Sequence, residues 1–168
     1  MNYSRGKITI PNVSGNIVIT ATAVASEKPN LFEKSPSKQS TSTAEVPGDM
    51  VYLGARLNSS HNVVYYSDTQ LVTRPIAVSY GDVLSIETDL ANGPSLSNSG
   101  YAALYDANGN FLYEFRTTEF TGLVWNWDSE YKKGTYKVEN TPGRDVSNAA
   151  FARFALAYTD IDKIVITK

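Results

Sequence analysis

Residues 100–115 read GYAALYDANGNFLYEF, two apolar runs on either side of Asn108-Gly109. An Asn-Gly pair between alternating hydrophobic residues is the strongest short-range signal of a β-hairpin, because both residues tolerate the positive φ of a tight reversal. The second run follows the period-two pattern of a strand. One predicted face carries Phe111, Tyr113 and Phe115, and the other carries Leu112, Glu114 and Arg116. The stretch therefore predicts an antiparallel hairpin.

The same period recurs on both sides of this hairpin, whereas the 3.6-residue period of an amphipathic helix is hard to find. Residues that alternate in this way are Leu84, Ile86 and Leu90, then Tyr136 and Val138, and finally Ile164 and Ile166. Short strands separated by turns every eight to twelve residues or so are typical of an antiparallel sandwich. We therefore expect an all-β fold built as a β-sandwich.

Two further turn signals and one ambiguous stretch complete this pattern. Tyr80-Gly81-Asp82 and Lys133-Gly134 contain residues that suit positions where two strands reverse. Residues 149–158 read AAFARFALAY and contain enough alanine for a helix. The alternation of Ala152, Phe154, Leu156 and Tyr158 also fits a strand.

Composition limits the possible partners and cofactors. The chain has 168 residues, enough for one well-buried domain, and a formal net charge of -2. No basic cluster is longer than Lys132-Lys133, so we expect neither a nucleic-acid nor a membrane partner. Cysteine is absent and His61 is the only histidine, which excludes thiol catalysis and multi-histidine metal sites. We expect no cofactor and no metal. Neither a membrane-spanning apolar run nor a signal-peptide pattern is found.

The chain divides into three segments. Residues 1–25 include GKITIPNVSGNIVITATA (6–23), two strand-like runs that need a partner because an isolated strand pair is marginally stable. Residues 26–49 are rich in Ser, Thr, Pro and Lys and predict a linker or a surface loop, with Leu31 and Phe32 docked on the main body. The sandwich is expected over residues 50–168.

Several of these stretches resemble a known family. GKITIPNVSGNIVITATA resembles the closing strands of immunoglobulin-like repeats in tail and baseplate proteins of phages that infect Gram-positive bacteria. LGARLNSS (53–60), RPIAVSYGDVLSI (74–86), residues 100–115 and ARFALAYTDIDKIVITK (152–168) resemble the lectin-like C-terminal modules of such receptor-binding proteins. The resemblance implies a jelly-roll-like sandwich and residues 1–25 as the remnant of, or junction to, an Ig-like domain. It also implies a virion location, extracellular action, other tail proteins as partners and a homo-oligomer, trimeric or higher.

The first candidate ligand site is GLVWNWDSEYKKG, residues 122–134. On a strand, Trp125 and Trp127 point to the same side. Either both indoles fill the core, or one of them, Trp127 in particular, stands at the rim as a stacking surface for a sugar. A saccharide presents apolar C–H groups ringed by hydroxyls, so its site needs an aromatic face and planar polar side chains. Such polar neighbours are Asn126, Asp128 and Tyr131.

The second candidate is the loop NTPGRDVSN (140–148), where Arg144 is able to grip hydroxyl pairs or an acidic group. The alternative for Arg144 is an exposed ion pair with Asp145, of little energetic consequence. DANGN (106–110) begins like a calcium loop, but Thr117 stands where that loop has glutamate, so a hairpin turn is favoured. Asp160 and Asp162 indicate a solvated turn rather than a metal site.

The residues together with the resemblance leave three function classes. We expect non-catalytic binding of a bacterial cell-wall saccharide, which mediates adsorption of a phage to its host. The alternative is a structural or decoration module of the virion that makes only protein contacts. A wall-polymer hydrolase is the third class, and it is disfavoured because the sequence contains no GxSxG, HExxH or P-loop signature.

Overall fold

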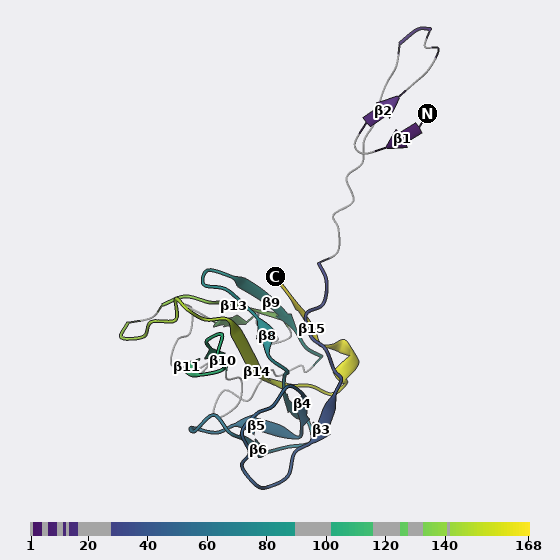
Figure 1. The fold of residues 1–168 in the computed structure, drawn as a ribbon. Helices are drawn as coiled ribbons and strands as arrows, with labels where there is room; N and C mark the ends of the chain where they lie inside the picture. The colour runs from purple at the N-terminus through teal and green to yellow at the C-terminus, as the bar shows by residue number, and fades with distance from the viewer. Residues whose placement is uncertain are drawn as a thin grey trace.

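The structure is a computed structural model that describes residues 2–4, 7–9, 12, 14–16, 28–89, 102–115, 125–127, 133–140 and 142–168. Described residues form strands and one short 3₁₀ helix, so the predicted all-β fold is confirmed (Figure 1). The strands are β1 (Asn2–Ser4), β2 (Lys7–Thr9), β3 (Ser37–Gln39), β4 (Val51–Leu53), β5 (Ala55–Leu57), β6 (Val63–Tyr65), β7 (Gln70–Val72), β8 (Ile76–Ala77), β9 (Val83–Glu87), β10 (Ala102–Tyr105), β11 (Phe111–Phe115), β12 (Trp125–Trp127), β13 (Lys133–Lys137), β14 (Phe151–Ala157) and β15 (Val165–Thr167), and the helix is η1 (Ile161–Lys163). This part of the chain contains no helix with the length and hydropathy needed to cross a membrane.

Two sheets pack face to face as a sandwich. The large sheet has the order β11-β10-β14-β7-β4-β3, and β8 also pairs with β14. The small sheet has the order β12-β13-β9-β15. One apolar core lies between the sheets, and the rings of Tyr136 from β13 and Phe154 from β14 meet edge to face in it, with centroids 5.2 Å apart. The predicted inward residues Leu84, Ile86, Val138, Ile164 and Ile166 are all buried in this core.

The large sheet is also covered on its second face. The hairpin β5–β6 packs there, and a second apolar cluster joins Leu57 and Val63 of the hairpin to Ala103 and Ala155 of the sheet. Because both faces are covered, every residue from Ala152 to Ala157 is buried. AAFARFALAY thus contains a strand, in which Ala152, Phe154 and Leu156 face the inter-sheet core and Ala155 faces the hairpin.

The β10–β11 hairpin forms at Asn108-Gly109 as predicted. Gly109 has φ of +80°, and the Asp106 carboxylate accepts hydrogen bonds from the backbone N–H groups of Asn108 and Asn110, both at 2.9 Å. The expected common face of Phe111 and Tyr113 is wrong. A bulge lies between the Leu104↔Tyr113 and Tyr105↔Phe111 pairs, and the extra residue shifts the alternation, so Tyr113 is buried while Phe111 is 37% exposed.

The other two turn predictions have different outcomes. Gly81 has φ of +90° in a turn after β8, but this turn leads from the large sheet to the small sheet, so its strands do not pair. The prediction of a reversal at Lys133-Gly134 is wrong. Gly134 lies inside β13, where it pairs with Trp127 on one side and with Ile86 on the other. Glycine also occurs inside strands, at positions where neighbouring groups approach the backbone closely. Residues 128–132, between β12 and β13, lie outside the described residues.

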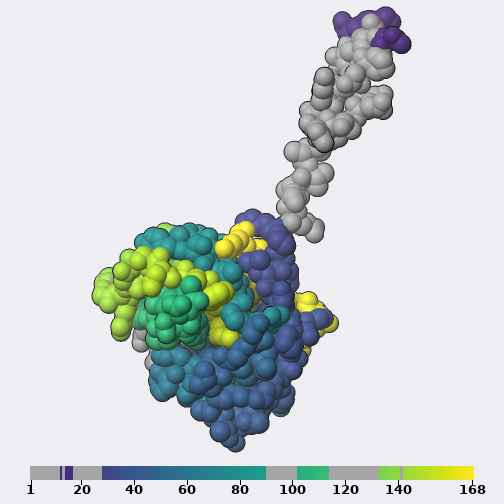
Figure 2. All heavy atoms as spheres, in the orientation of Figure 1, coloured from purple at the N-terminus to yellow at the C-terminus, as the bar shows by residue number. Residues whose placement is uncertain are grey.

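The segment that follows residue 27 packs along the C-terminal strand. Phe32 is buried in the inter-sheet core and Leu31 packs against it. The backbone N–H of Leu31 donates to the carbonyl of Ile166 at 2.6 Å, and Figure 2 shows the indigo atoms of this segment beside the yellow C-terminal atoms. The predicted linker also contains an edge strand, β3, which pairs in parallel with β4 and keeps exposed side chains.

The predicted N-terminal strand pair is described only in its first run. β2 falls in the first predicted run, but it pairs with β1, from residues before that run. The second predicted run, residues 17–23, lies outside the described residues. Among the described strands, β1 and β2 pair only with each other.

Candidate binding groove

A groove of about 590 Å³ opens on the second face of the large sheet, and we refer to it as the arginine groove. Its volume lies in the range of small-molecule sites. Four segments line it: the loop before β4, the β7–β8 connection, the end of β10 with its turn, and β14. The lining residues are Val46, Pro47, Asp49, Arg74, Pro75, Tyr105, Ala107, Asn108, Gly109, Phe151 and Arg153.

Arg153 is the most buried charge of the groove, only 5% exposed. Its position in β14 places it on the hairpin-covered face, next to Ala155. One Nη donates to the carbonyl of Thr73 at 2.9 Å and the other donates to the carbonyl of Gly48. Burial lowers the pKa of Arg153, but an arginine side chain stays protonated at neutral pH. The groove therefore contains a desolvated positive charge.

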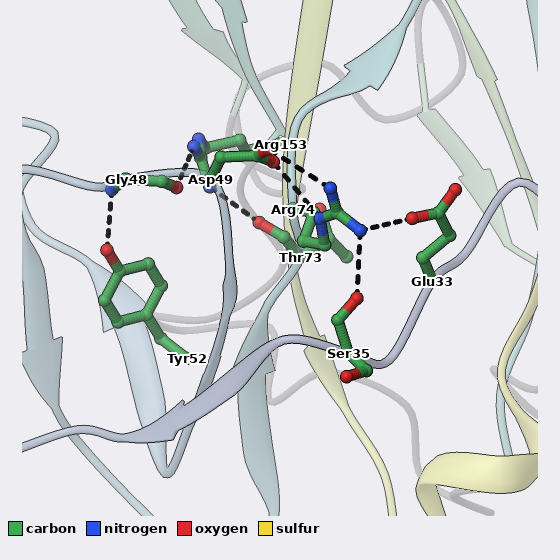
Figure 3. A network of polar contacts seen from close by, with 8 residues as sticks. All are labelled: Glu33, Ser35, Gly48, Asp49, Tyr52, Thr73, Arg74 and Arg153. Carbon is green, nitrogen blue, oxygen red and sulfur yellow. Dashed lines mark hydrogen bonds and ion pairs between the residues drawn. The ribbon is translucent and has the colours of Figure 1, made fainter.

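Arg74 is held by two carboxylates (Figure 3). Its Nε and one Nη donate to the two carboxylate oxygens of Asp49, both at 3.1 Å. The other Nη donates to Glu33 and to the carbonyl of Ser35. The hydrogen bond with Arg74 holds the pKa of Asp49 below its usual value, and the same bond raises the pKa of Arg74.

The wall formed by the loop before β4 is fixed at several points. Gly48 donates its backbone N–H to the Tyr52 hydroxyl oxygen at 2.6 Å, and its carbonyl accepts from Arg153. Farther back, Glu45 and Val63 exchange two backbone hydrogen bonds, at 3.0 and 2.7 Å. The wall is thus positioned before any ligand arrives, which lowers the cost of binding.

Aromatic rings supply the apolar part of the groove. Tyr105 and Phe151 are opposite each other in the β10–β14 register and both line the groove. Phe111 meets Tyr105 edge to face at 6.0 Å between centroids. His61 stacks on Phe111, with centroids 3.3 Å apart and planes 16° apart. The aromatic rings therefore continue from the groove through Phe111 of β11 to His61, which lies between β5 and β6.

The residues predicted from the sequence lie elsewhere. Trp125, Asn126 and Trp127 form β12, opposite Tyr136, Thr135 and Gly134 of β13. Asp128 and Tyr131 lie outside the described residues, as do the side chains of β12. The choice between core and rim for the tryptophans stays open, and their role in binding stays a prediction.

Arg144 is not among the residues that line the groove. Its guanidinium lies 4.9 Å from the centroid of the Tyr113 ring, which faces the inter-sheet core. The alternative for Arg144, an ion pair with Asp145, is not found in the described residues, and the role of Arg144 in binding stays a prediction. Asp145 instead accepts a hydrogen bond from the backbone N–H of Ser147 at 2.9 Å, and this bond lowers the pKa of Asp145.

The other acidic residues singled out by the sequence have structural roles. The Asp106 carboxylate orders the β10–β11 turn, and its pKa is lowered, first by the bond from the Asn110 side chain. Asp160 caps η1 by accepting from the backbone N–H of Asp162 at 3.0 Å. In the described parts of the chain, no three His, Cys, Asp or Glu side chains gather in a way that suits a metal ion.

Comparisons with known proteins find no relative: no family model, curated protein or solved structure matches this chain. The chemistry of the groove residues is therefore the basis for a functional proposal. Sequence reasoning missed them, although one signal was present. Arg153 is a charged residue inside the apolar run FARFALA, and a charge in a buried strand is uncommon unless it is paired or serves a site.

Proposed function

We propose that this chain is a non-catalytic saccharide-binding module and that the arginine groove is its binding site. The observation that carries this proposal is the meeting of aromatic rings and planar polar groups in one groove. Tyr105 and Phe151 offer apolar surface, while Asp49, Asn108 and Arg153 offer groups that bind hydroxyls. A sugar ring needs this combination, because its C–H face packs on aromatics and its hydroxyls need donors and acceptors.

The same residues favour binding over hydrolysis. Glycosidases commonly use two carboxyl groups on either side of the scissile bond. Asp49 is the one carboxylate among the described residues that line the groove. It is bound by Arg74, and its lowered pKa keeps it ionised, which does not suit a general acid. These features support a role in which no bond is broken.

For the biological setting, we propose attachment of a phage tail or baseplate to a saccharide of the bacterial cell wall. The support is the resemblance of four stretches to lectin-like modules and the all-β sandwich. The jelly-roll topology, the virion location and a trimeric or higher assembly belong to this proposal. Affinity at one groove is expected to be weak, and several copies acting together raise it without new contacts.

A glycan array of purified wall polysaccharides tests this proposal. The full chain is applied beside Phe151→Ala and Asn108→Ala, which remove an aromatic face and an amide from the groove. Asn148→Ala is the matched control, because Asn148 is exposed and does not line the groove. We expect both groove variants to lose signal while the control binds normally. Normal binding by all three, or no binding by the wild type, would contradict the proposal.

The alternative, a structural virion module, is favoured by two exposed apolar residues, one in the turn before β9 and one in β9 itself. Tyr80 and Val83 are each 49% exposed, and Val83 lies opposite Lys137 on the outer face of the small sheet. An exposed apolar pair suits contact with another protein. Sedimentation of the Val83→Lys variant tests this role, since loss of assembly with unchanged glycan binding would assign Val83 to an interface and leave the groove function in place.

A further inference from the structure

The two arginines of the groove differ in how their N–H groups are used. Arg74 makes four hydrogen bonds, three of them to the carboxylates of Asp49 and Glu33. Arg153 makes two, both to backbone carbonyls. A guanidinium has five N–H donors, so five minus two leaves three donors of Arg153 without a partner in the described part of the chain.

The buried positive charge of Arg153 also has no carboxylate hydrogen-bonded to it in the described part of the chain. Buried charges are normally paired with an opposite charge, because removal from water is costly. Asp49 favours the charged form of Arg153 only at a distance, while its two oxygens are bonded to Arg74. Glu33 is likewise bonded to Arg74. The groove therefore offers a buried cation with free donors and no carboxylate bonded to it.

We propose that the arginine groove selects an acidic saccharide, whose carboxylate or phosphate binds Arg153. This inference rests on the proposed saccharide-binding function and adds the chemical class of the ligand. The planar fork of a guanidinium matches two oxygens of a carboxylate or phosphate at once. Tyr105 and Phe151 line the same groove and pack against the rest of the sugar.

Matched polymers test the inference directly. The full chain is titrated with polygalacturonate and with the same polymer after reduction of its carboxyl groups to alcohols. Phosphorylated dextran and unmodified dextran form the second pair. We expect the acidic member of one pair to bind about tenfold to a hundredfold more tightly, as for a charge-assisted hydrogen bond. Preference within the first or the second pair identifies a carboxylate or a phosphate as the source.

The salt dependence and an arginine signal separate a binding role from a structural one. Affinity for the preferred acidic polymer should fall as ionic strength rises, whereas affinity for the neutral member should not. The side-chain Nε–H resonance of Arg153 should shift when the acidic polymer is added, and that of Arg56, which stacks on Tyr66, should stay in place. Unmoved Arg153 with tight binding would overturn the inference.

Substitutions provide the last comparison. Arg153→Lys keeps the charge but loses the fork, and Arg153→Met removes the charge while filling the space. Both are compared with Arg56→Ala, since Arg56 stacks on Tyr66 and does not line the groove. If Arg153→Met fails to fold, the polymer pairs and the resonance shift still decide. Equal binding of the acidic and the neutral polymer in both pairs would overturn the preference for an acidic ligand but leave saccharide binding in place. A glycan array without any signal would overturn saccharide binding itself.

Discussion

Arg74 and Asp49 form a two-bond ion pair, in which Nε and one Nη of Arg74 donate to the two carboxylate oxygens of Asp49 at 3.1 Å each. The pair joins the β7–β8 connection to the loop before β4. Through Glu33 and the carbonyl of Ser35, Arg74 also reaches the segment that follows residue 27. The Arg74 guanidinium thus links three separate parts of the chain beside the groove.

This ion pair predicts how Asp49 titrates. The bonds from Arg74 hold the pKa of Asp49 below its ordinary value of 3.8. The folded-state pKa is depressed, so the stabilisation is present at neutral pH and is lost as the pH falls through the folded pKa. In Arg74→Gln, carboxyl-carbon NMR should show the Asp49 pKa rising toward its ordinary value. Asp145 is the internal control, because its lowered pKa comes from Ser147. An unchanged Asp49 titration would mean that the pair does not form in solution.

The sandwich was predictable from the sequence because burial of one strand face leaves a local pattern. Leu84 with Ile86 and Tyr136 with Val138 alternate with polar residues, and each pair faces the core. The bulge at Leu104/Tyr105 was not predictable, because the inserted residue is also apolar and leaves the sequence pattern intact. The second covered face was also missed, since only the fold shows that β5–β6 lies over Ala155 of β14.

The covered second face predicts a strong effect at Ala155. The Ala155→Leu variant should lower the free energy of unfolding by about 2 kcal/mol, because extra methylenes do not fit beneath β5–β6. Chemical denaturation measures the change. Ala77→Leu, at an exposed position of β8, should be nearly neutral. Equal stability of the two variants would mean that the hairpin does not pack on this face.

The binding groove could be predicted far less well than the fold. Its polar contacts join residues distant in sequence, such as Gly48 with Arg153, which are 105 positions apart. Alternation assigns a residue to a face but does not tell which loop covers that face. Local composition predicts a site around Trp125 and Trp127, whereas the groove brings together four segments whose individual compositions are ordinary.

The β10–β11 turn predicts a backbone effect at Gly109. Its φ of +80° is costly for a residue with a Cβ, although no atom lies within 4 Å of a Cβ built there. Gly109→Ala should therefore cost about 1 kcal/mol of stability through backbone strain alone. Gly109→Asn should cost less, because asparagine tolerates this conformation. Thermal unfolding of the two variants compares them, and a larger loss in the asparagine variant would argue against the turn geometry.

The last prediction concerns Asn30, whose side chain completes the free edge of β15. Its Oδ1 accepts from the backbone N–H groups of Ile166 at 2.8 Å and Phe32 at 3.0 Å, and its Nδ2 donates to the carbonyl of Ile164 at 3.0 Å. An edge strand with unpaired backbone groups tends to pair with other chains, and this side chain occupies those groups. Asn30→Ala removes all three bonds and should cost about 1–2 kcal/mol of stability in a denaturant titration.

Asn30→Asp separates the two roles of this amide, because the carboxylate still accepts both hydrogen bonds but donates none to Ile164. Its stability at neutral pH should lie between that of wild type and that of Asn30→Ala. Asn148→Ala, an exposed asparagine, provides the baseline for the loss of an amide. Light scattering at high protein concentration adds a second readout, since an open β15 edge should promote association in Asn30→Ala. Wild-type stability in both Asn30 variants would show that the segment after residue 27 does not hold β15 in solution.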